Sequence, residues 1–149
     1  MKFWDTCAIV PLLILESRSE TMKLIRQDDE DLVVWWGTAV EASSVFARLR
    51  REKKLTVSEE QQLRNRIGAL AEYWTEIVPS DAVRNLAHRL LLRHQLRAAD
   101  SFQLAAALVW VGDRPEDNSF VCLDVRLRDA ARAEGFMVLP TEEDFRLLT

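Results

Sequence analysis

Residues 119–135 read SFVCLDVRLRDAARAEG, and this stretch decides the fold class. The apolar run Ser119–Leu123 predicts a short strand, and Leu127–Ala133 predicts a helix. Gly135 follows the helix at the position where glycine commonly ends one. Asp124 stands between the two elements, at the carboxyl end of the strand. The stretch therefore predicts a strand, an acidic turn and a helix in succession.

The N-terminus repeats this order. Lys2 to Asp5 predicts a first strand ending at an acid, and Thr6 leads into a helix that Pro11 opens or kinks. Between the two units, further strands are predicted at 32–36 and 76–78, with a last one at 136–139. Helices are predicted at 20–27, 38–52, from an N-cap at Ser58 to 74, from Ser80 or Asp81 to 94, and from Asp100 to 111, with a polar loop at 112–118.

Strands that alternate with helices predict a parallel sheet covered on both faces. We therefore expect a three-layer α/β/α fold with a central parallel sheet of four to five short strands. The chain has 149 residues, only four glycines and four prolines, and no visible linker or repeat, so one domain over 1–149 is expected.

The composition favours a globular cytoplasmic protein. Hydrophobic residues make up 48% and charged residues 30%, and no apolar run reaches the roughly 18 residues of a membrane span. The apolar N-terminus differs from a secretion signal because Asp5 interrupts it and Glu16 follows without a small-residue cleavage site. No membrane partner is expected.

Four acids occupy positions where acids are unusual. Asp5 and Asp124 end apolar strands, Glu41 lies between Val40 and Ala42, and Asp100 interrupts a small apolar stretch. A buried carboxylate is costly unless it is paired or binds a metal. In parallel sheets, sites form beyond the carboxyl ends of the strands. If the fold gathers these acids, they predict a divalent cation site with oxygen ligands.

Each acid also has a purely structural interpretation. Asp5, together with Thr6, and Asp100 suit helix N-caps, a role compatible with metal binding. Glu41 suits a salt bridge with a nearby arginine in helix packing. Asp124 suits an ordinary turn network, whose other members would be Arg126 and Arg128.

The cysteines and arginines carry weaker signals. Cys7 and Cys122 lack the paired spacing of a zinc motif, so we expect small buried side chains there. Net charge is −4, yet basic residues gather at 48–54 and 84–97, where they form either solvated helix faces or phosphate contacts. Leu13, Ile14 and Met22 are candidates for an exposed apolar contact surface.

Four segments in order, FWDTCAIVPLL, AVEASSVFARL, LRAADSFQLAAAL and FVCLDVRLRDAARAEGF, resemble PIN-domain ribonucleases. The toxins of VapC-type toxin–antitoxin pairs are the most similar members. The resemblance spans nearly the whole chain. Many relatives carry histidine where this chain has Gln103, but all four acids of the family pattern are retained.

The resemblance implies an endoribonuclease toxin that depends on Mg²⁺ or Mn²⁺. It places the family's four acids on Asp5, Glu41, Asp100 and Asp124, as catalytic and metal-binding residues, with Thr6 as a supporting hydroxyl. It also implies a VapB-like antitoxin partner, an RNA substrate such as a tRNA or rRNA loop, and a homodimer or toxin–antitoxin hetero-oligomer.

Two other functions were weighed from the residues. A phosphatase or receiver domain is disfavoured, since Cys7 stands where a phosphatase would place a second aspartate, and no lysine follows Lys54. A non-catalytic or RNA-binding module on the same fold is the remaining alternative, and the intact acidic set argues against it.

Overall fold

A computed structural model describes residues 1–29 and 31–149. The central sheet contains five parallel strands in the order β3-β2-β1-β4-β5. They are β1 (Lys2–Trp4), β2 (Leu32–Trp35), β3 (Thr75–Ile77), β4 (Ser119–Val121) and β5 (Met137–Leu139). The predicted α/β class and the five-stranded parallel sheet are confirmed.

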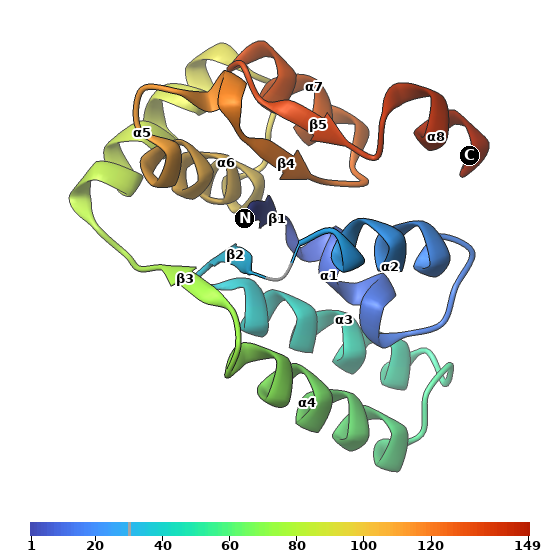
Figure 1. Ribbon diagram of the computed structural model, residues 1–149. Coiled ribbons are helices and arrows are strands. Elements are labelled where there is room, and N and C mark those ends of the chain that lie inside the picture. The colour runs from blue at the N-terminus through green and yellow to red at the C-terminus, as the bar shows by residue number, and fades with distance from the viewer. Residues whose placement is uncertain (30) are drawn as a thin grey trace.

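The helices cover both faces of this sheet (Figure 1). They are α1 (Thr6–Leu13), α2 (Ser19–Gln27), α3 (Thr38–Arg51), α4 (Val57–Ala71), α5 (Asp81–Arg93), α6 (Ala98–Val111), α7 (Val125–Ala133) and α8 (Glu142–Leu147), with a 3₁₀ turn η1 at Pro115–Asp117. Helices α1 to α4 lie on one face, and α5 to α7 lie on the other.

Alternation along the strands divides the core into two clusters. In β1, Phe3 packs toward α5, α6 and α7, whereas Trp4 packs toward α1 to α4. Phe120 and Val121 of β4 alternate in the same way. Because successive strand side chains point to opposite faces, β1 and β4 each contribute to both clusters. This is why the inner strands are apolar almost throughout, as expected for a sheet buried on both faces.

Several predicted boundaries need correction. Thr56, not Ser58, caps α4, and its side chain forms a reciprocal capping box with Glu59. Helix α6 begins at Ala98, two residues before Asp100, so Asp100 is not its N-cap. Ser80 caps α5 by accepting a hydrogen bond from the Val83 amide at 3.2 Å.

Three further differences concern elements rather than their caps. Pro11 lies inside α1 instead of opening it. The polar stretch predicted as a loop contains η1, and α8 was not predicted. The predicted end of α7 is confirmed: Gly135 follows the C-cap Glu134 with φ 109°, a conformation that favours glycine.

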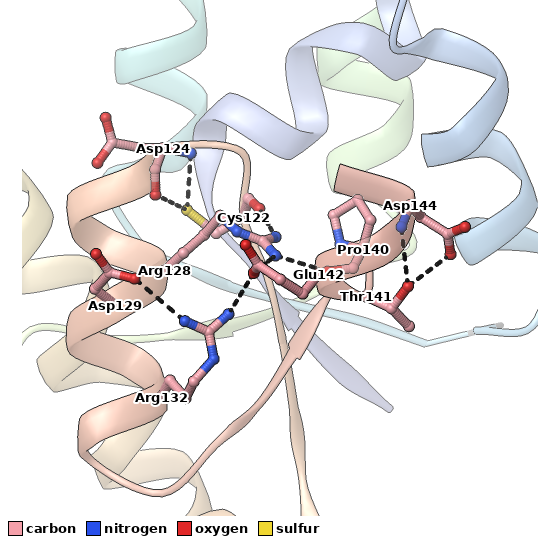
Figure 2. Close-up of polar contacts among 9 residues, drawn as sticks. All are labelled: Cys122, Asp124, Arg128, Asp129, Arg132, Pro140, Thr141, Glu142 and Asp144. Atoms are coloured by element: carbon pink, nitrogen blue, oxygen red, sulfur yellow. Dashed lines mark hydrogen bonds and ion pairs between the residues drawn. The ribbon is translucent and has the colours of Figure 1, made fainter. Parts of the chain in front are cut away.

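Arg128 of α7 attaches the C-terminal segment to the end of β4 (Figure 2). Its buried guanidinium donates to the carbonyl oxygens of Cys122 and Pro140, each at 2.9 Å. It also lies 3.5 Å from a Glu142 carboxylate oxygen and 4.0 Å from the ring centre of Phe145. These contacts fix the turn that carries Asp124, because Arg128 follows the turn in the sequence and its guanidinium holds the Cys122 carbonyl that precedes it.

Candidate metal centre

Two of the four predicted acids lie on adjacent strand ends. Asp5 follows β1 and Asp124 follows shortly after β4, and the strand order changes direction between these two strands. Each acid also caps the next helix. Asp5 accepts a hydrogen bond from the Cys7 amide, and Asp124 accepts one from the Leu127 amide, both at 2.9 Å. The capping interpretation is therefore correct for Asp5, and Asp124 also caps a helix although no cap was predicted there. These hydrogen bonds fix where each carboxylate points.

The other two acids come from helix starts. Glu41 lies in the first turn of α3, and Asp100 lies in the first turn of α6. A cavity of about 450 Å³ is lined by all four acids, together with Thr6, Cys7 and Arg18 among other residues. The fold thus brings together four carboxylates that are up to 119 residues apart in the sequence. Their assignment as catalytic metal ligands stays a prediction.

The four carboxyl groups form a gradient of burial. Asp5 is only 5% exposed, Glu41 and Asp100 are half-buried, and Asp124 is exposed. The cavity therefore has a buried acid at its base and a solvated acid at its rim.

Burial and mutual repulsion raise the pKa values of the inner acids. Burial raises the pKa of Asp5 from 3.8 to about 7, opposed by the hydrogen bonds from Cys7 and assisted by the charges of Glu41 and Asp100. The pKa of Glu41 is raised by burial and by Asp100. The pKa of Asp100 is raised by burial and by Asp124, although Arg97 opposes this. The charges therefore act on one another as a group.

A buried amide network positions Glu41. Thr6 Oγ1 donates to Glu41 Oε2 at 3.0 Å, and Gln103 Nε2 donates to Thr6 Oγ1 at 3.0 Å. The same nitrogen lies 3.2 Å from Thr38 Oγ1 and 3.3 Å from Glu41 Oε1. These bonds oppose the rise in the pKa of Glu41, because they stabilise its ionised form.

This network refines one expectation and corrects another. Thr6 was predicted as a supporting hydroxyl next to Asp5, and the carboxylate to which its hydroxyl donates is that of Glu41. The arginine salt bridge considered for Glu41 is replaced by Thr6 and Gln103. Gln103 was noted only as a departure from the family pattern, and its polar side chain between the apolar Phe102 and Leu104 was the sequence signal of a buried role.

The turn network considered for Asp124 is also wrong. Arg128 contacts the Cys122 and Pro140 carbonyl oxygens rather than Asp124. Among residues 1–29 and 31–149, Asp5, Glu41, Asp100 and Asp124 form no ion pair with a basic side chain.

Arginines flank the acids without neutralising them. A second cavity, of about 600 Å³, shares Asp100 and Asp124 with the first and is lined by Arg97 and Arg126. Arg48 lines the first cavity. Much of the two basic clusters is otherwise paired on helix faces, as with Arg93 and Glu134 at 3.0 Å. The interpretation of the basic clusters as solvated helix faces therefore describes most of these residues. Arg48, Arg97 and Arg126 line the two cavities.

The donor set fits a hard divalent cation. Mg²⁺ and Mn²⁺ prefer carboxylate and water oxygens, and Mg²⁺ is usually held by one or two carboxylates plus phosphate oxygens. Burial raises the pKa of Asp5, and no basic side chain among the described residues compensates its charge. A cation would supply that compensation, so the residues present suit such an ion.

The apolar surface predicted in the first two helices is only partly exposed. Met22 is fully buried, which contradicts its proposed exposure, and Leu13 and Ile14 pack partly against the core. Among the described residues, Leu15 and Leu24 are the exposed large aliphatic side chains of this region.

Among residues 1–29 and 31–149, no helix combines the length and the apolar character of a membrane-spanning segment.

Comparison with known proteins gives matches in structure only. No protein-family model matches the chain, and no curated protein sequence matches it. A toxin–antitoxin complex from Klebsiella pneumoniae is similar with a TM-score of 0.62 and 12% identity, covering 85% of this chain and 88% of that one. FitAcB from Neisseria gonorrhoeae is similar with a TM-score of 0.66 and 17% identity, covering 93% of this chain and 96% of that one. At these identities the likeness shows a shared fold over nearly the whole chain.

Proposed function

We propose that this protein is a metal-dependent endoribonuclease toxin of a toxin–antitoxin pair. The observation that carries the proposal is the convergence of Asp5, Glu41, Asp100 and Asp124 on one cavity, without a basic ion-pair partner among the described residues. The position beyond the carboxyl ends of β1 and β4, where the strand order reverses, is where open α/β sheets bind ligands.

Asp5 and Asp100 would hold Mg²⁺ or Mn²⁺ directly. Asp124 would complete that site or hold a second ion, and Glu41 would bind through water or orient the attacking water. When bound, the metal lowers the pKa of water and stabilises negative charge on the phosphate and the leaving oxygen. Thr6 and Gln103 hold the Glu41 carboxylate in place, so that it can accept a proton from, or orient, a water molecule.

The arginines beside the acids supply the second part of a nuclease site. Arg97 and Arg126 line one cavity, and Arg48 lines the other. Guanidinium groups bind phosphate oxygens through paired hydrogen bonds, so they would hold the RNA backbone on either side of the carboxylates. A single-stranded loop of tRNA or rRNA fits such a site better than a duplex, since its bases are splayed and its backbone is accessible.

The toxin role is supported by the similarity to the Klebsiella pneumoniae structure. One is described as a toxin–antitoxin complex, and its fold covers most of this chain. By this analogy, a VapB-like antitoxin would bind the protein and cover the acidic cavity, in a homodimer or toxin–antitoxin hetero-oligomer. The analogy is one of fold, so the partner has to be tested separately from the chemistry.

The test is cleavage of a purified cellular RNA pool by antitoxin-free protein with Mg²⁺ or Mn²⁺. Asp5→Asn keeps the helix-capping oxygen but removes the charge, and Asp113→Asn, in the exposed turn beyond the opposite end of α6, is the matched control. We expect discrete fragments that disappear with chelator and with Asp5→Asn, but persist in Asp113→Asn. Cleavage that survives both chelator and Asp5→Asn would refute the mechanism, and a folded, metal-binding but inactive protein would favour the non-catalytic RNA-binding module.

A further inference from the structure

The two cysteines meet beneath the acidic cavity, although the sequence separates them widely. Cys7 lies in the first turn of α1, and Cys122 directly follows β4. Their Sγ atoms are 3.7 Å apart. Asp5 offers a carboxylate oxygen in the same place, so that these three ligand atoms all lie within 4.8 Å of one another. The absence of a zinc motif in the sequence therefore did not exclude a thiolate site.

The spacing suits tetrahedral coordination by sulfur. Zn²⁺ binds cysteine sulfur at about 2.3 Å, and two such ligands at the tetrahedral angle stand about 3.8 Å apart. The 3.7 Å between Cys7 and Cys122 matches this separation without rearrangement. Because two thiols in ordinary contact can show a similar distance, the distance needs support from a second observation.

That observation is a pair of backbone donors aimed at the sulfurs. The Leu123 amide donates to Cys7 Sγ at 3.1 Å, and the Asp124 amide donates to Cys122 Sγ at 3.4 Å. Figure 2 shows the second of these contacts at the end of β4. Amide donors to sulfur stabilise thiolate charge and are the kind of outer contact that tunes metal–sulfur sites. In the metal-free protein the pKa of both thiols is raised, that of Cys7 by its contact with Cys122 and by burial, and that of Cys122 by burial. The two consecutive amides would therefore stabilise the sulfurs as anionic ligands once a cation binds.

Access and local charge also favour a cation here. Cys122 is fully buried, but Cys7 is only half-buried and lines the cavity of about 450 Å³ that holds the four acids. An ion that passes the rim of the cavity would thus reach Asp5 and Cys7 before it reaches the buried Cys122. Asp5 uses Oδ2 to accept the Cys7 amide, which leaves its other carboxylate oxygen for an ion.

We propose that Cys7, Cys122 and Asp5 form a binding site for a thiophilic divalent cation of the Zn²⁺ class, with water as the fourth ligand. Binding converts both thiols to thiolates and releases their two protons to solvent, and no electron is transferred. Three protein ligands and one open position resemble the composition of zinc sites that bind an exchangeable water. Mg²⁺ would not compete well for this site, because it prefers oxygen ligands.

The shared ligand links this site to the nuclease centre. Asp5 cannot serve a sulfur-bound ion and the carboxylate-bound Mg²⁺ with the same oxygen. If the proposed function holds, the thiophilic ion therefore inhibits RNA cleavage by occupying Asp5. This consequence rests on the proposed function, whereas ion binding itself does not.

The direct test is titration of the reduced, metal-free protein with Cd²⁺, whose bonds to thiolate give an ultraviolet charge-transfer band. We expect the band to saturate at one ion per chain, to be absent with Mg²⁺, and to disappear in Cys7→Ser and in Cys122→Ser. Asp5→Asn should weaken binding at least about tenfold while keeping the band. No band in the wild-type protein, or an undiminished band in either cysteine variant, would overturn the proposal.

A measurement on the wild-type chain avoids dependence on folding of the variants. One equivalent of Cd²⁺ should slow alkylation of Cys7 by a maleimide, and an excess of Mg²⁺ should not. Equal alkylation rates with and without Cd²⁺ would contradict the site. In a separate activity test, Cd²⁺ added to the Mg²⁺ reaction should inhibit the wild type more than Cys7→Ser. Binding without cleavage in any sample would refute the proposed function alone, because the metal site would still be shown.

Discussion

Two carboxylates in this protein are almost equally buried but have opposite surroundings. Glu60 of α4 is 8% exposed and lies between Arg50 and Arg64, with Arg64 Nη2 at 2.9 Å. These partners lower its pKa, with Arg64 contributing most. Asp5 is 5% exposed, has acidic neighbours, and has its pKa raised to about 7. The same chain therefore neutralises one acid with arginine and leaves the other uncompensated.

The difference separates an acid whose charge is balanced by arginines of the protein from one whose charge, under the proposed function, would be balanced by a bound cation. Arginines lie close enough to line the acidic cavities, yet Arg48 faces Glu52 at 4.0 Å, and Arg18 pairs with Glu16 at 2.9 Å. A group of carboxylates without compensation is costly in the free protein. Such a cost is typical of functional sites, where a bound cation turns the repulsion into attraction.

The largest expected effect is on catalysis. If the proposed function holds, Asp100→Asn should lower the rate of metal-dependent RNA cleavage by at least about 100-fold, because it removes a proposed metal ligand worth several kcal/mol in the transition state. Glu60→Gln removes a similarly buried carboxylate but should leave the rate within about twofold. Initial rates of cleavage of the mapped RNA target measure the effect of each variant. Equal losses of rate in Asp100→Asn and Glu60→Gln would contradict the functional difference between the two kinds of acid.

The next effect is a pH-dependent stability difference at Asp5. Its raised pKa means that the folded protein retains a proton which the unfolded chain loses near pH 3.8. Without metal, stability should therefore fall as the pH rises from about 4 to about 7. Asp5→Asn should remove this loss and be more stable than wild type at pH 8 by roughly 1–4 kcal/mol, but nearly equal at pH 4. Urea unfolding with chelator at both pH values tests this, and a constant difference would contradict it.

Added Mg²⁺ should offset the loss of folding stability that the ionised Asp5 carboxylate causes at high pH. An ion that binds only the folded state stabilises by RT ln(1 + [L]/Kd), about 2.7 kcal/mol at 100 times Kd. The melting temperature of the wild type at pH 8 should therefore rise with Mg²⁺, and that of Asp5→Asn should change little. An equal rise in both proteins would indicate binding elsewhere.

A smaller effect is expected from the amide network around Glu41. Gln103→Leu removes the donor to Thr6 and Glu41 while keeping similar bulk, so Glu41 loses its fixed position. We expect cleavage to fall about tenfold, in proportion to one or two hydrogen bonds to a charged group. Gln103→His should recover part of the rate, since histidine can donate from a similar place. A full rate in Gln103→Leu would show that the network is only structural.

The smallest effect concerns Glu60 itself. Glu60→Gln should lower the stability slightly, because it weakens the contacts with Arg50 and Arg64, whose side chains are themselves partly exposed to solvent. The loss should shrink at high salt, and unfolding in low and high salt measures it. A stability gain at pH 8, as expected for Asp5→Asn, would mean that the two acids do not differ as described.

Local sequence was sufficient for most elements. All five strands were predicted, four of them from apolar runs and β3 from the short stretch before Pro79. The glycine after α7 marked the end of that helix, because the chain there adopts a positive φ. Helix α8 was missed because its six residues bury little beyond Phe145, so it lacks the apolar periodicity that signals a helix. The start of α4 was misplaced because Thr56 and Ser58 are both good N-cap residues. They are distinguished only by the hydrogen bond that the Glu59 backbone amide donates to the Thr56 side chain.

Sequence alone also identified the four acids, since a carboxylate in an apolar run violates burial preferences wherever the run folds. It could not assign their partners. Thr6 and Gln103 are 97 residues apart, and their 3.0 Å hydrogen bond exists only because α1 and α6 meet at one end of the sheet. The pairing of Cys7 with Cys122 has the same origin, since it follows from β1 and β4 being neighbours.

The sequence by itself thus determined the α/β alternation and the unusual acids, because periodicity, capping and burial preference are local properties. The tertiary structure decided which groups share a cavity and which of the described acids lack a basic partner. It also brought the two sulfurs together beside the Asp5 carboxylate. Those properties depend on distances of 3 to 5 Å between distant segments, and strand order sets such distances.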